Sequence, residues 1–147
     1  MRPRSFRRLV PLVAVLALAG CGSAASSGAA TISDAWARPA AAGGMSAAYF
    51  TITNTSTTAD ALLSVSSPSA AMVQLHETSV DAAGVAAMHP VARVAVQAGG
   101  SVAFKPGSYH LMLMGLTSEL SAGKTIQLDL VFEHAGKVVV QAEIRQG

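Results

Sequence analysis

The sequence contains 147 residues, of which 51% are apolar, 12% are charged and 5% are aromatic. This length suits a single domain, and the apolar content argues against a disordered chain, which would be charged and poor in apolar residues. The formal net charge is +2, but four of the ten basic residues lie within the first eight positions, and the rest of the chain carries six basic and eight acidic residues. Because that remainder has no basic run, the composition argues against a protein that binds nucleic acid.

The first 20 residues have the organisation of a secretory signal peptide. Basic residues between Arg2 and Arg8 precede an apolar run at Val10–Leu18, which is shorter than the roughly 20 residues that a membrane-spanning helix needs. The segment Leu18-Ala19-Gly20-Cys21 then resembles a bacterial lipobox, in which the cysteine is lipid-modified and becomes the new N-terminus. This resemblance predicts lipidation of Cys21. The alternative is a plain signal peptide followed by an incidental cysteine.

Small and polar residues follow the cysteine at 22–30, a composition that is typical of a flexible tether. We therefore divide the sequence into a signal peptide (1–20), a lipidated cysteine with its tether (21–31) and one folded domain (32–147). Such a protein would be extracytoplasmic and held at a bacterial membrane by its lipid. Cys21 is the only cysteine, so the sequence can form no internal disulfide.

Three segments of the domain alternate apolar and polar residues, at 48–53, 126–133 and 138–145. A period of two is typical of a strand with one buried face. Ala135-Gly136, between the last two segments, favours a hairpin turn. No segment shows helical periodicity over three turns. We therefore expect an all-β domain of about seven to nine strands, arranged as a two-sheet sandwich or a Greek-key barrel.

Histidine and methionine gather in particular segments of the domain. Within the sequence HLMLM at 110–114, the histidine and both methionines would share one face of a strand, and the two leucines would share the other. The leucines can fill the core, which leaves an imidazole and two thioethers on the opposite side. A second strand at 72–77 would turn His76 outward, and Met88 follows after a turn expected at 81–84.

Imidazole and thioether groups are both neutral ligands, and the thioether sulfur is soft. Soft thioethers favour Cu(I), whereas zinc and iron sites more often use thiolate or carboxylate ligands. A lone methionine is usually a core filler, and a lone histidine is usually a surface residue or a hydrogen-bonding one. The grouping of both residue types on one strand face, beside a second histidine on another strand, favours a Cu(I) site.

The spacing of these residues resembles that of the periplasmic copper chaperone family PCuAC, whose motif is H-x10-M-x21-H-x-M. His110-x-Met112 matches the end of the motif, and 21 residues separate Met88 from His110, as in the family. Eleven residues separate His76 from Met88, one more than in the motif, and we expect the extra residue to lie in the turn at 79–84. The resemblance covers about residues 32–145 and includes the flanking segments Asp34–Pro39, Ala47–Phe50, Val91, Gly99-Gly100, Pro106-Gly107 and Tyr109–Leu116.

The resemblance implies a cupredoxin-like β-barrel that binds one Cu(I) ion and hands it to the copper centre of cytochrome c oxidase. The implied metal ligands are His76, Met88, His110 and Met112. Met114 would pack beside them, and no residue is implied to be catalytic. The partner would be the copper-accepting subunit of the oxidase or another copper chaperone. The chain departs from many relatives at Thr78, where they carry a further methionine, and it has no His- or Met-rich C-terminal tail.

Four alternatives compete with this hypothesis. An electron-transfer blue-copper protein needs a thiolate ligand, and the only cysteine is Cys21. An enzyme is disfavoured, because nothing resembles a Ser/His/Asp set or a His-rich zinc triad. A copper storage or resistance protein would use the same site for another purpose, although one site per domain suits a carrier better. In a sandwich lipoprotein of interaction type that binds no metal, the cluster of histidine and methionine would be incidental.

Overall fold

The computed structural model describes residues 29–147, so the predicted signal peptide and Cys21 lie outside the described residues. The elements of the described part are the strands β1 (Ala30–Ala37), β2 (Met45–Asn54), β3 (Asp60–Ser66), β4 (Ala70–Val80), β5 (Ala86–Pro90), β6 (Val94–Val96), β7 (Ser101–Phe104), β8 (Tyr109–Leu116), β9 (Thr125–Phe132) and β10 (Gly136–Ile144). Nowhere in this part is there a helix of the length and apolar character that a membrane crossing requires. The all-β prediction is confirmed.

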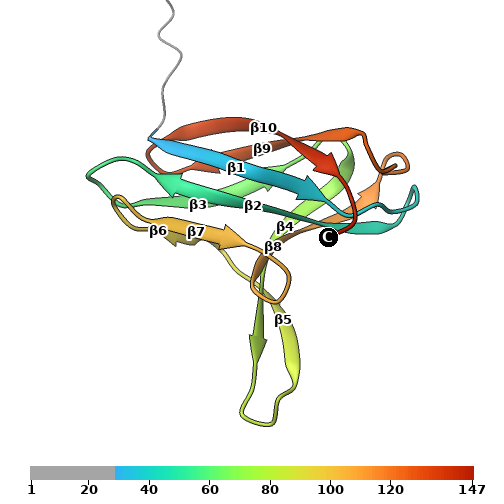
Figure 1. Cartoon of the computed structure of the whole chain (residues 1–147), viewed down its shortest axis with the longest axis horizontal. Coiled ribbons are helices and arrows are strands. Elements are labelled where there is room, and N and C mark those ends of the chain that lie inside the picture. The colour runs from blue at the N-terminus through green and yellow to red at the C-terminus, as the bar shows by residue number, and fades with distance from the viewer. Residues whose placement is uncertain (1–28) are drawn as a thin grey trace, which may run out of the picture.

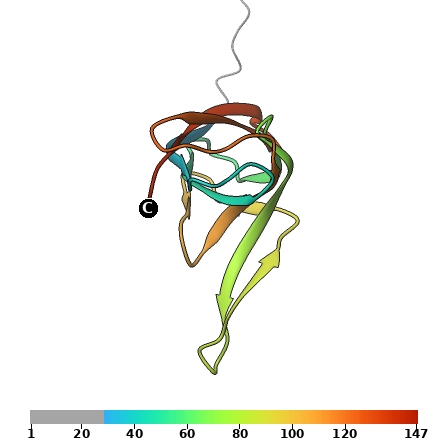
Figure 2. The same cartoon turned by 90° about the vertical axis from the view of Figure 1, so that its right-hand side faces the viewer.

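The ten strands form one sheet in the order β5-β4-β8-β7-β2-β1-β10-β9-β3-β6, with β8 also pairing with β2. β1 runs parallel to β10 and β7 runs parallel to β8, while the other pairings are antiparallel. The sheet curls until β3 contacts β4, although the two strands are not neighbours in the hydrogen-bonded order. Figures 1 and 2 show the resulting barrel and the β4–β5 hairpin that projects from it.

The apolar side chains of the alternating strands fill the interior of this barrel. In β9 the residues Ile126, Leu128, Leu130 and Phe132 are buried and the residues between them are not, as the period of two predicts. In β8 both leucines of the HLMLM segment are fully buried. Each such side chain contributes about 1.5–3 kcal/mol through burial. Because the two leucines point into the core, the histidine and the two methionines of this segment project from the opposite face of β8.

The expected hairpin between the last two strands is present. Phe132 pairs with Gly136, whose φ of 72° is readily adopted only by glycine. The buried carboxylate of Asp60, at the start of β3, accepts hydrogen bonds from the backbone N–H groups of His134 and Ala135, both over 2.9 Å. A residue 74 positions earlier in the chain therefore holds the turn in place.

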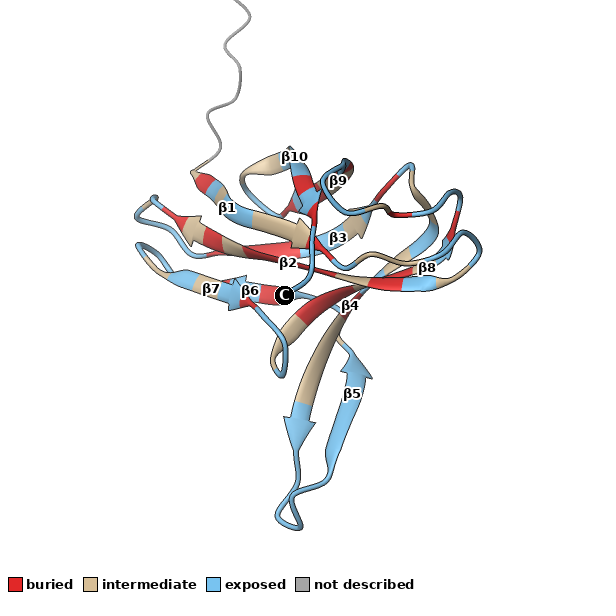
Figure 3. Ribbon diagram, turned by 45° about the vertical axis from the view of Figure 1, so that its right-hand side comes forward, coloured by how far each residue is buried: buried red, intermediate tan, exposed pale blue. Residues whose placement is uncertain are grey.

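The β4–β5 hairpin is closed by a turn at the predicted position. Oδ1 of Asp81 accepts hydrogen bonds from the backbone N–H groups of Ala83 and Val85, both over 2.9 Å. Every residue from 79 to 90 is exposed, and the projecting part of the hairpin accordingly appears pale blue in Figure 3. The hairpin thus extends from the barrel with no core of its own.

Two features differ from the expectations. The domain has ten strands rather than seven to nine, because β5, β6 and β7 contain five, three and four residues and are too short for alternation to mark them. β1 begins at Ala30, so Ala30 and Thr31 belong to the sheet and not to the tether. They pair with Asn54 and Thr53 of β2.

Candidate metal centre

β4 and β8 place two histidines side by side. His76 and His110 are direct partners in the antiparallel pairing, and the centroids of their rings lie 5.6 Å apart. Directly opposed residues project from the same face of a sheet. That face is the one opposite Leu75 and Leu111, which lie in the core. His76 is partly buried, and His110 is only 5% exposed.

Hydrogen bonds determine which nitrogen of each ring is free. Nε2 of His76 lies 3.1 Å from Oε1 of Gln74, and Nδ1 of His110 lies 3.1 Å from the carbonyl oxygen of Ser108. Both oxygens only accept, so we assign the ring protons to these two nitrogens. The free nitrogens are therefore Nδ1 of His76 and Nε2 of His110. A histidine whose other N–H is held by a carbonyl oxygen is the usual arrangement of a metal ligand.

The free nitrogen of His76 lacks a hydrogen-bond partner in the described part of the chain. Nδ1 of His76 is buried and has no hydrogen-bond partner among the described residues. An unpaired polar atom in the interior costs free energy, and such an atom in a folded protein calls for a reason. A metal ion bound to this nitrogen would supply the missing partner.

The protonation state of His76 also suits metal binding. Burial lowers the pKa of the His76 imidazole below its ordinary value of 6.5, and the neighbouring His110 lowers this pKa further. Both effects favour the neutral ring. Only the neutral ring has the lone pair that binds a metal.

The two predicted methionine ligands lie on the same face of the sheet as His76, but neither is directly opposite it on the neighbouring strand. Met112 of β8 is opposite Gln74, and Met88 of β5 is opposite Thr78, so each is a diagonal neighbour of His76. The Cβ atoms of diagonal neighbours are about 7–8 Å apart, within reach of long side chains. Met112 is partly buried and Met88 is 60% exposed. The structure thus groups Met112 with the two histidines and leaves Met88 on the projecting hairpin.

The face that carries these side chains is rich in sulfur and has no acidic residue. We call the outward face of β2, β8, β4 and β5 the methionine face, because it carries all methionines of the described residues. These are Met45, Met72, Met88, Met112 and Met114. No residue on this face of the four strands is charged, and the cation beside it is the guanidinium of Arg38, 6.0 Å from the centroid of the Tyr49 ring. An ion bound there would keep its full charge, which costs less for a monovalent than for a divalent ion.

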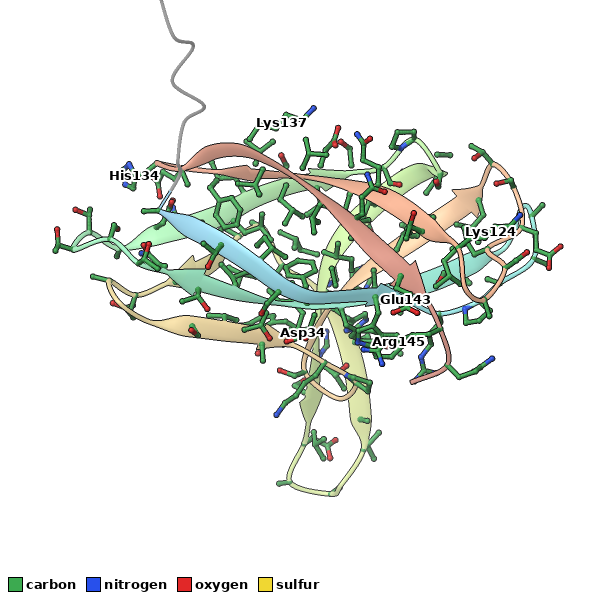
Figure 4. The ribbon with its side chains drawn as sticks, turned by 45° about the horizontal axis from the view of Figure 1, so that its top comes forward. Asp34, Lys124, His134, Lys137, Glu143 and Arg145 are labelled. Carbon is green, nitrogen blue, oxygen red and sulfur yellow. The ribbon has the colours of Figure 1, made fainter. Side chains whose placement is uncertain are left out.

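The remaining histidines do not contribute to this centre. His89 of β5 is opposite Glu77, which places both on the other face of the hairpin. His134 lies in the β9–β10 turn, far from the hairpin (Figure 4). Within residues 29–147, the side chains of His, Cys, Asp and Glu nowhere gather in threes around a possible metal ion. The methionines are therefore the neighbours that matter for the paired histidines.

Two residues that orient the rings could not be recognised from the sequence. Gln74 and Ser108 each stand two positions before the histidine that they contact. Gln74 shares a face of β4 with His76, because residues two apart on a strand do so. Ser108 lies just before β8 and acts through its backbone carbonyl, for which the side-chain sequence carries no signal. The sequence also gives no indication that the Gln74 amide contacts Nε2 of His76 whereas the Ser108 carbonyl contacts Nδ1 of His110.

Comparison with known proteins supports the same family. The family model described as "Putative lipoprotein LpqE-like" matches residues 30–144. The chain belongs to the LpqE-like family. A relative within the curated proteins is "Putative lipoprotein Lxx21020" of Leifsonia xyli subsp. xyli (strain CTCB07). It is 31% identical over 114 residues, which cover 78% of this chain and 68% of the relative.

This LpqE-like protein also resembles two solved structures. "Copper-bound PCuAC domain from PmoF2" has a TM-score of 0.68 and 24% identity, covering 82% of this chain and 95% of that domain. "Solution structure of CuI-DR1885 from Deinococcus radiodurans" has a TM-score of 0.61 and 28% identity, covering 84% of each chain. These similarities confirm the resemblance to the PCuAC family and the cupredoxin-like β fold.

Proposed function

We propose that this LpqE-like protein is an extracytoplasmic Cu(I) chaperone whose ligands are His76, His110, Met112 and Met88. The observation that carries the proposal is the pairing of two imidazoles next to a thioether, with Nδ1 of His76 buried and lacking a partner. Such a site would act as a carrier of copper and would catalyse no reaction.

The choice of Cu(I) follows from the donor atoms. Imidazole nitrogen and thioether sulfur are neutral, and soft thioether sulfur selects Cu(I) over ions that prefer oxygen or thiolate. Of the two similar solved structures, one is described as copper-bound and the other as the Cu(I) form of its protein.

The position of Met88 supports a carrier that releases its ion. Met88 stands on an exposed strand of the projecting hairpin, whereas both histidines belong to strands that pack on the core. Methionine has three flexible bonds, so its sulfur can approach or leave a bound ion without disturbing the barrel. Withdrawal of this one thioether would open a coordination position for a ligand of the acceptor protein.

Competition experiments test the metal. We expect the purified protein to bind Cu(I) in the presence of a Cu(I) chelator and Zn(II) to leave that binding unchanged at equal concentration. The double variant His76→Ala/His110→Ala removes the tight Cu(I) binding, while His89→Ala, on the other face of the same hairpin, serves as the matched control. Equal competition by Zn(II) would rule out the proposed ligand set.

Delivery to cytochrome c oxidase rests on the resemblance to the PCuAC family. We expect the copper-loaded protein to transfer Cu(I) to the apo form of the copper-binding domain of the oxidase, with native mass spectrometry following the ion. Retention of copper by the LpqE-like protein at equal concentrations of the acceptor would favour the alternative role in copper storage or resistance.

Membrane anchoring through Cys21 completes the proposal. The lipoprotein descriptions of the family and of the Leifsonia relative support it. We expect Cys21→Ser to abolish lipidation and to release the protein from the membrane fraction, while Cu(I) affinity stays unchanged because the proposed ligands all lie in the β domain. Loss of Cu(I) binding in this variant would make the cysteine a ligand and contradict the division of roles.

A further inference from the structure

Three methionines form a row across three neighbouring strands. Met114 of β8 is the direct partner of Met45 on β2 and also of Met72 on β4. The Cβ atoms of directly opposed residues are about 4.5–5.5 Å apart, and such residues project from the same face of the sheet. The three thioethers therefore start from adjacent points on the methionine face. We call Met45, Met114 and Met72 the methionine row.

Core packing does not account for this row. Met45 is 65% exposed, Met72 is 52% exposed and Met114 is partly buried. The interior beneath the row is already filled, because Leu113, which follows the alternation to the other face, is fully buried. A methionine that fills a gap in the core is buried in it. These three side chains instead place sulfur at the surface.

The surroundings of the row favour a soft cation of low charge. The next residues along the same face of the three strands, all uncharged, are Ala47, Met112 and Gln74. The neighbouring cation, Arg38, is hydrogen-bonded through its backbone to Ala47 and lies over Tyr49. No acidic residue on this face would attract a divalent ion. The unbranched methionine side chain has three rotatable bonds, so the three sulfur atoms can converge on one point above Met114. Thioether sulfur is a poor ligand for Zn(II), Mg(II) or Ca(II), which take thiolate, imidazole or oxygen.

We infer that Met45, Met72 and Met114 form a second metal site, made of three thioethers, that takes one soft monovalent ion, Cu(I) or Ag(I). The row lies beside the chaperone site and shares no ligand with it. Met72 and His76 are four residues apart on β4, about 13 Å along a strand, and Met114 and Met112 are two residues apart on β8. This second site goes beyond the proposed function and does not depend on it, since none of its three ligands belongs to the set proposed for the chaperone site.

Titration with Ag(I) tests this site, because Ag(I) binds the same soft ligands as Cu(I) and does not change oxidation state during the measurement. We expect the full-length protein to bind two equivalents of Ag(I) by isothermal titration calorimetry. The triple variant Met45→Leu/Met72→Leu/Met114→Leu loses one of them. Leucine keeps the size and apolar character of methionine and lacks the sulfur, and circular dichroism verifies that the variant is folded.

Two further variants separate this inference from the proposed function. His76→Ala/His110→Ala removes the other equivalent and leaves the methionine row able to bind Ag(I). Val80→Ala is the matched control, since it changes an exposed apolar residue on the same face of β4 and leaves both sets of ligands intact. In protein labelled with 13C at the methionine methyl groups, we expect the signals of Met45, Met72 and Met114 to shift together on addition of Ag(I) to the histidine variant.

Two results would overturn the inference. The first is a triple leucine variant that binds as many equivalents of Ag(I) as the unmodified protein. The second is a histidine variant that binds no Ag(I) and in which these three methyl signals stay in place. If the methionine row binds no Ag(I), the proposed copper site at the paired histidines is not contradicted. If the histidine site binds no metal, the inference about the row is not contradicted. The two sites are therefore tested independently.

Discussion

Gln74 accepts a hydrogen bond from Nε2 of His76, over 3.1 Å, and leaves the other ring nitrogen, Nδ1, buried and without a hydrogen-bond partner among the described residues. The same glutamine is the direct cross-strand partner of Met112. The Gln74 amide therefore neighbours both an imidazole and a thioether that we assign to one copper ion. Gln74 orients the His76 ring and is not itself assigned as a ligand.

The first prediction concerns this amide. Gln74→Leu removes the acceptor that holds the proton on Nε2, so His76 is free to place that proton on Nδ1, the nitrogen assigned to the metal. We expect the affinity for Cu(I) to fall by about 10–100-fold, the usual effect of losing a residue that orients a metal ligand. Competition with a Cu(I) chelator measures the affinity. Gln141→Leu, at an exposed glutamine of β10, is the matched control. Equal affinities of the two variants would remove Gln74 from the site.

The second prediction separates binding from stability within the histidine pair. His110 is buried and hydrogen-bonded to the carbonyl oxygen of Ser108, which also accepts a hydrogen bond from the backbone N–H of Thr78. His110→Ala therefore removes a buried side chain together with its hydrogen bond, and we expect it to cost about 1–3 kcal/mol of unfolding free energy. His76→Ala weakens Cu(I) binding but leaves no buried nitrogen unpaired, so we expect little loss of stability. Urea unfolding of both variants without metal makes the comparison. A larger loss of stability for His76→Ala than for His110→Ala would contradict this assignment.

The third prediction concerns Met88 on the projecting hairpin. Because Met88 is exposed, Met88→Leu is expected to change the unfolding free energy by less than about 0.5 kcal/mol. We expect the affinity for Cu(I) to fall about tenfold, which corresponds to about 1.4 kcal/mol of binding free energy. Stopped-flow transfer to a chelator shows whether the ion leaves faster. Val80→Ala changes an exposed apolar residue of the same hairpin and serves as the control. If Cu(I) leaves both variants at the rate of the unmodified protein, Met88 is no ligand.

The fourth prediction concerns acid stability through Asp60. Burial raises the pKa of this carboxyl, but hydrogen bonds from the backbone N–H groups of His134, Ala135 and Ala61 outweigh it, so the pKa lies below its ordinary value of 3.8. A lowered pKa in the folded state stabilises the fold above about pH 4, and this contribution is lost as the pH falls through the lowered value. Asp60→Asn is expected to remove this dependence and to cost about 1–3 kcal/mol at pH 7.

Chemical unfolding at pH 7 and pH 3 measures this effect. The difference between the unmodified protein and Asp60→Asn is expected to shrink at the lower pH. Glu119→Gln neutralises an exposed acidic residue and is the control. A constant difference at both pH values would show that the Asp60 carboxyl titrates alike in the folded and unfolded chain.

Local patterns were sufficient to predict the parts of the fold that repeat along the chain. The alternation at 126–133 gave β9 and its buried face, and the HLMLM segment gave the outward direction of His110. Such patterns depend only on the period of a strand. They could not give the pairing of His76 with His110, or the contact of Asp60 with His134 across 74 residues, because strand order and register are set by contacts between distant segments.

The same limit explains why Met45 and Met72 received no role from the sequence. They lie 27 positions apart, on strands that are not joined by a hairpin, and only the placement of β8 between β2 and β4 brings both opposite Met114. The exposure of Met45 and Met72 also depends on how the strands assemble, and the sequence alone does not give it. A methionine in a sequence carries no mark that separates a surface ligand from a core filler.

The direction in which the hairpin projects gives the molecule two unlike ends. β1 begins on one side of the barrel, and the tip of the β4–β5 hairpin lies on the opposite side (Figures 1 and 2). In a protein anchored through the residues before β1, the attachment point and the hairpin tip would lie on opposite sides, so the tip could face away from the lipid surface. Copper would then be held at the distal end, where an acceptor protein can approach from the aqueous side without displacing the anchor.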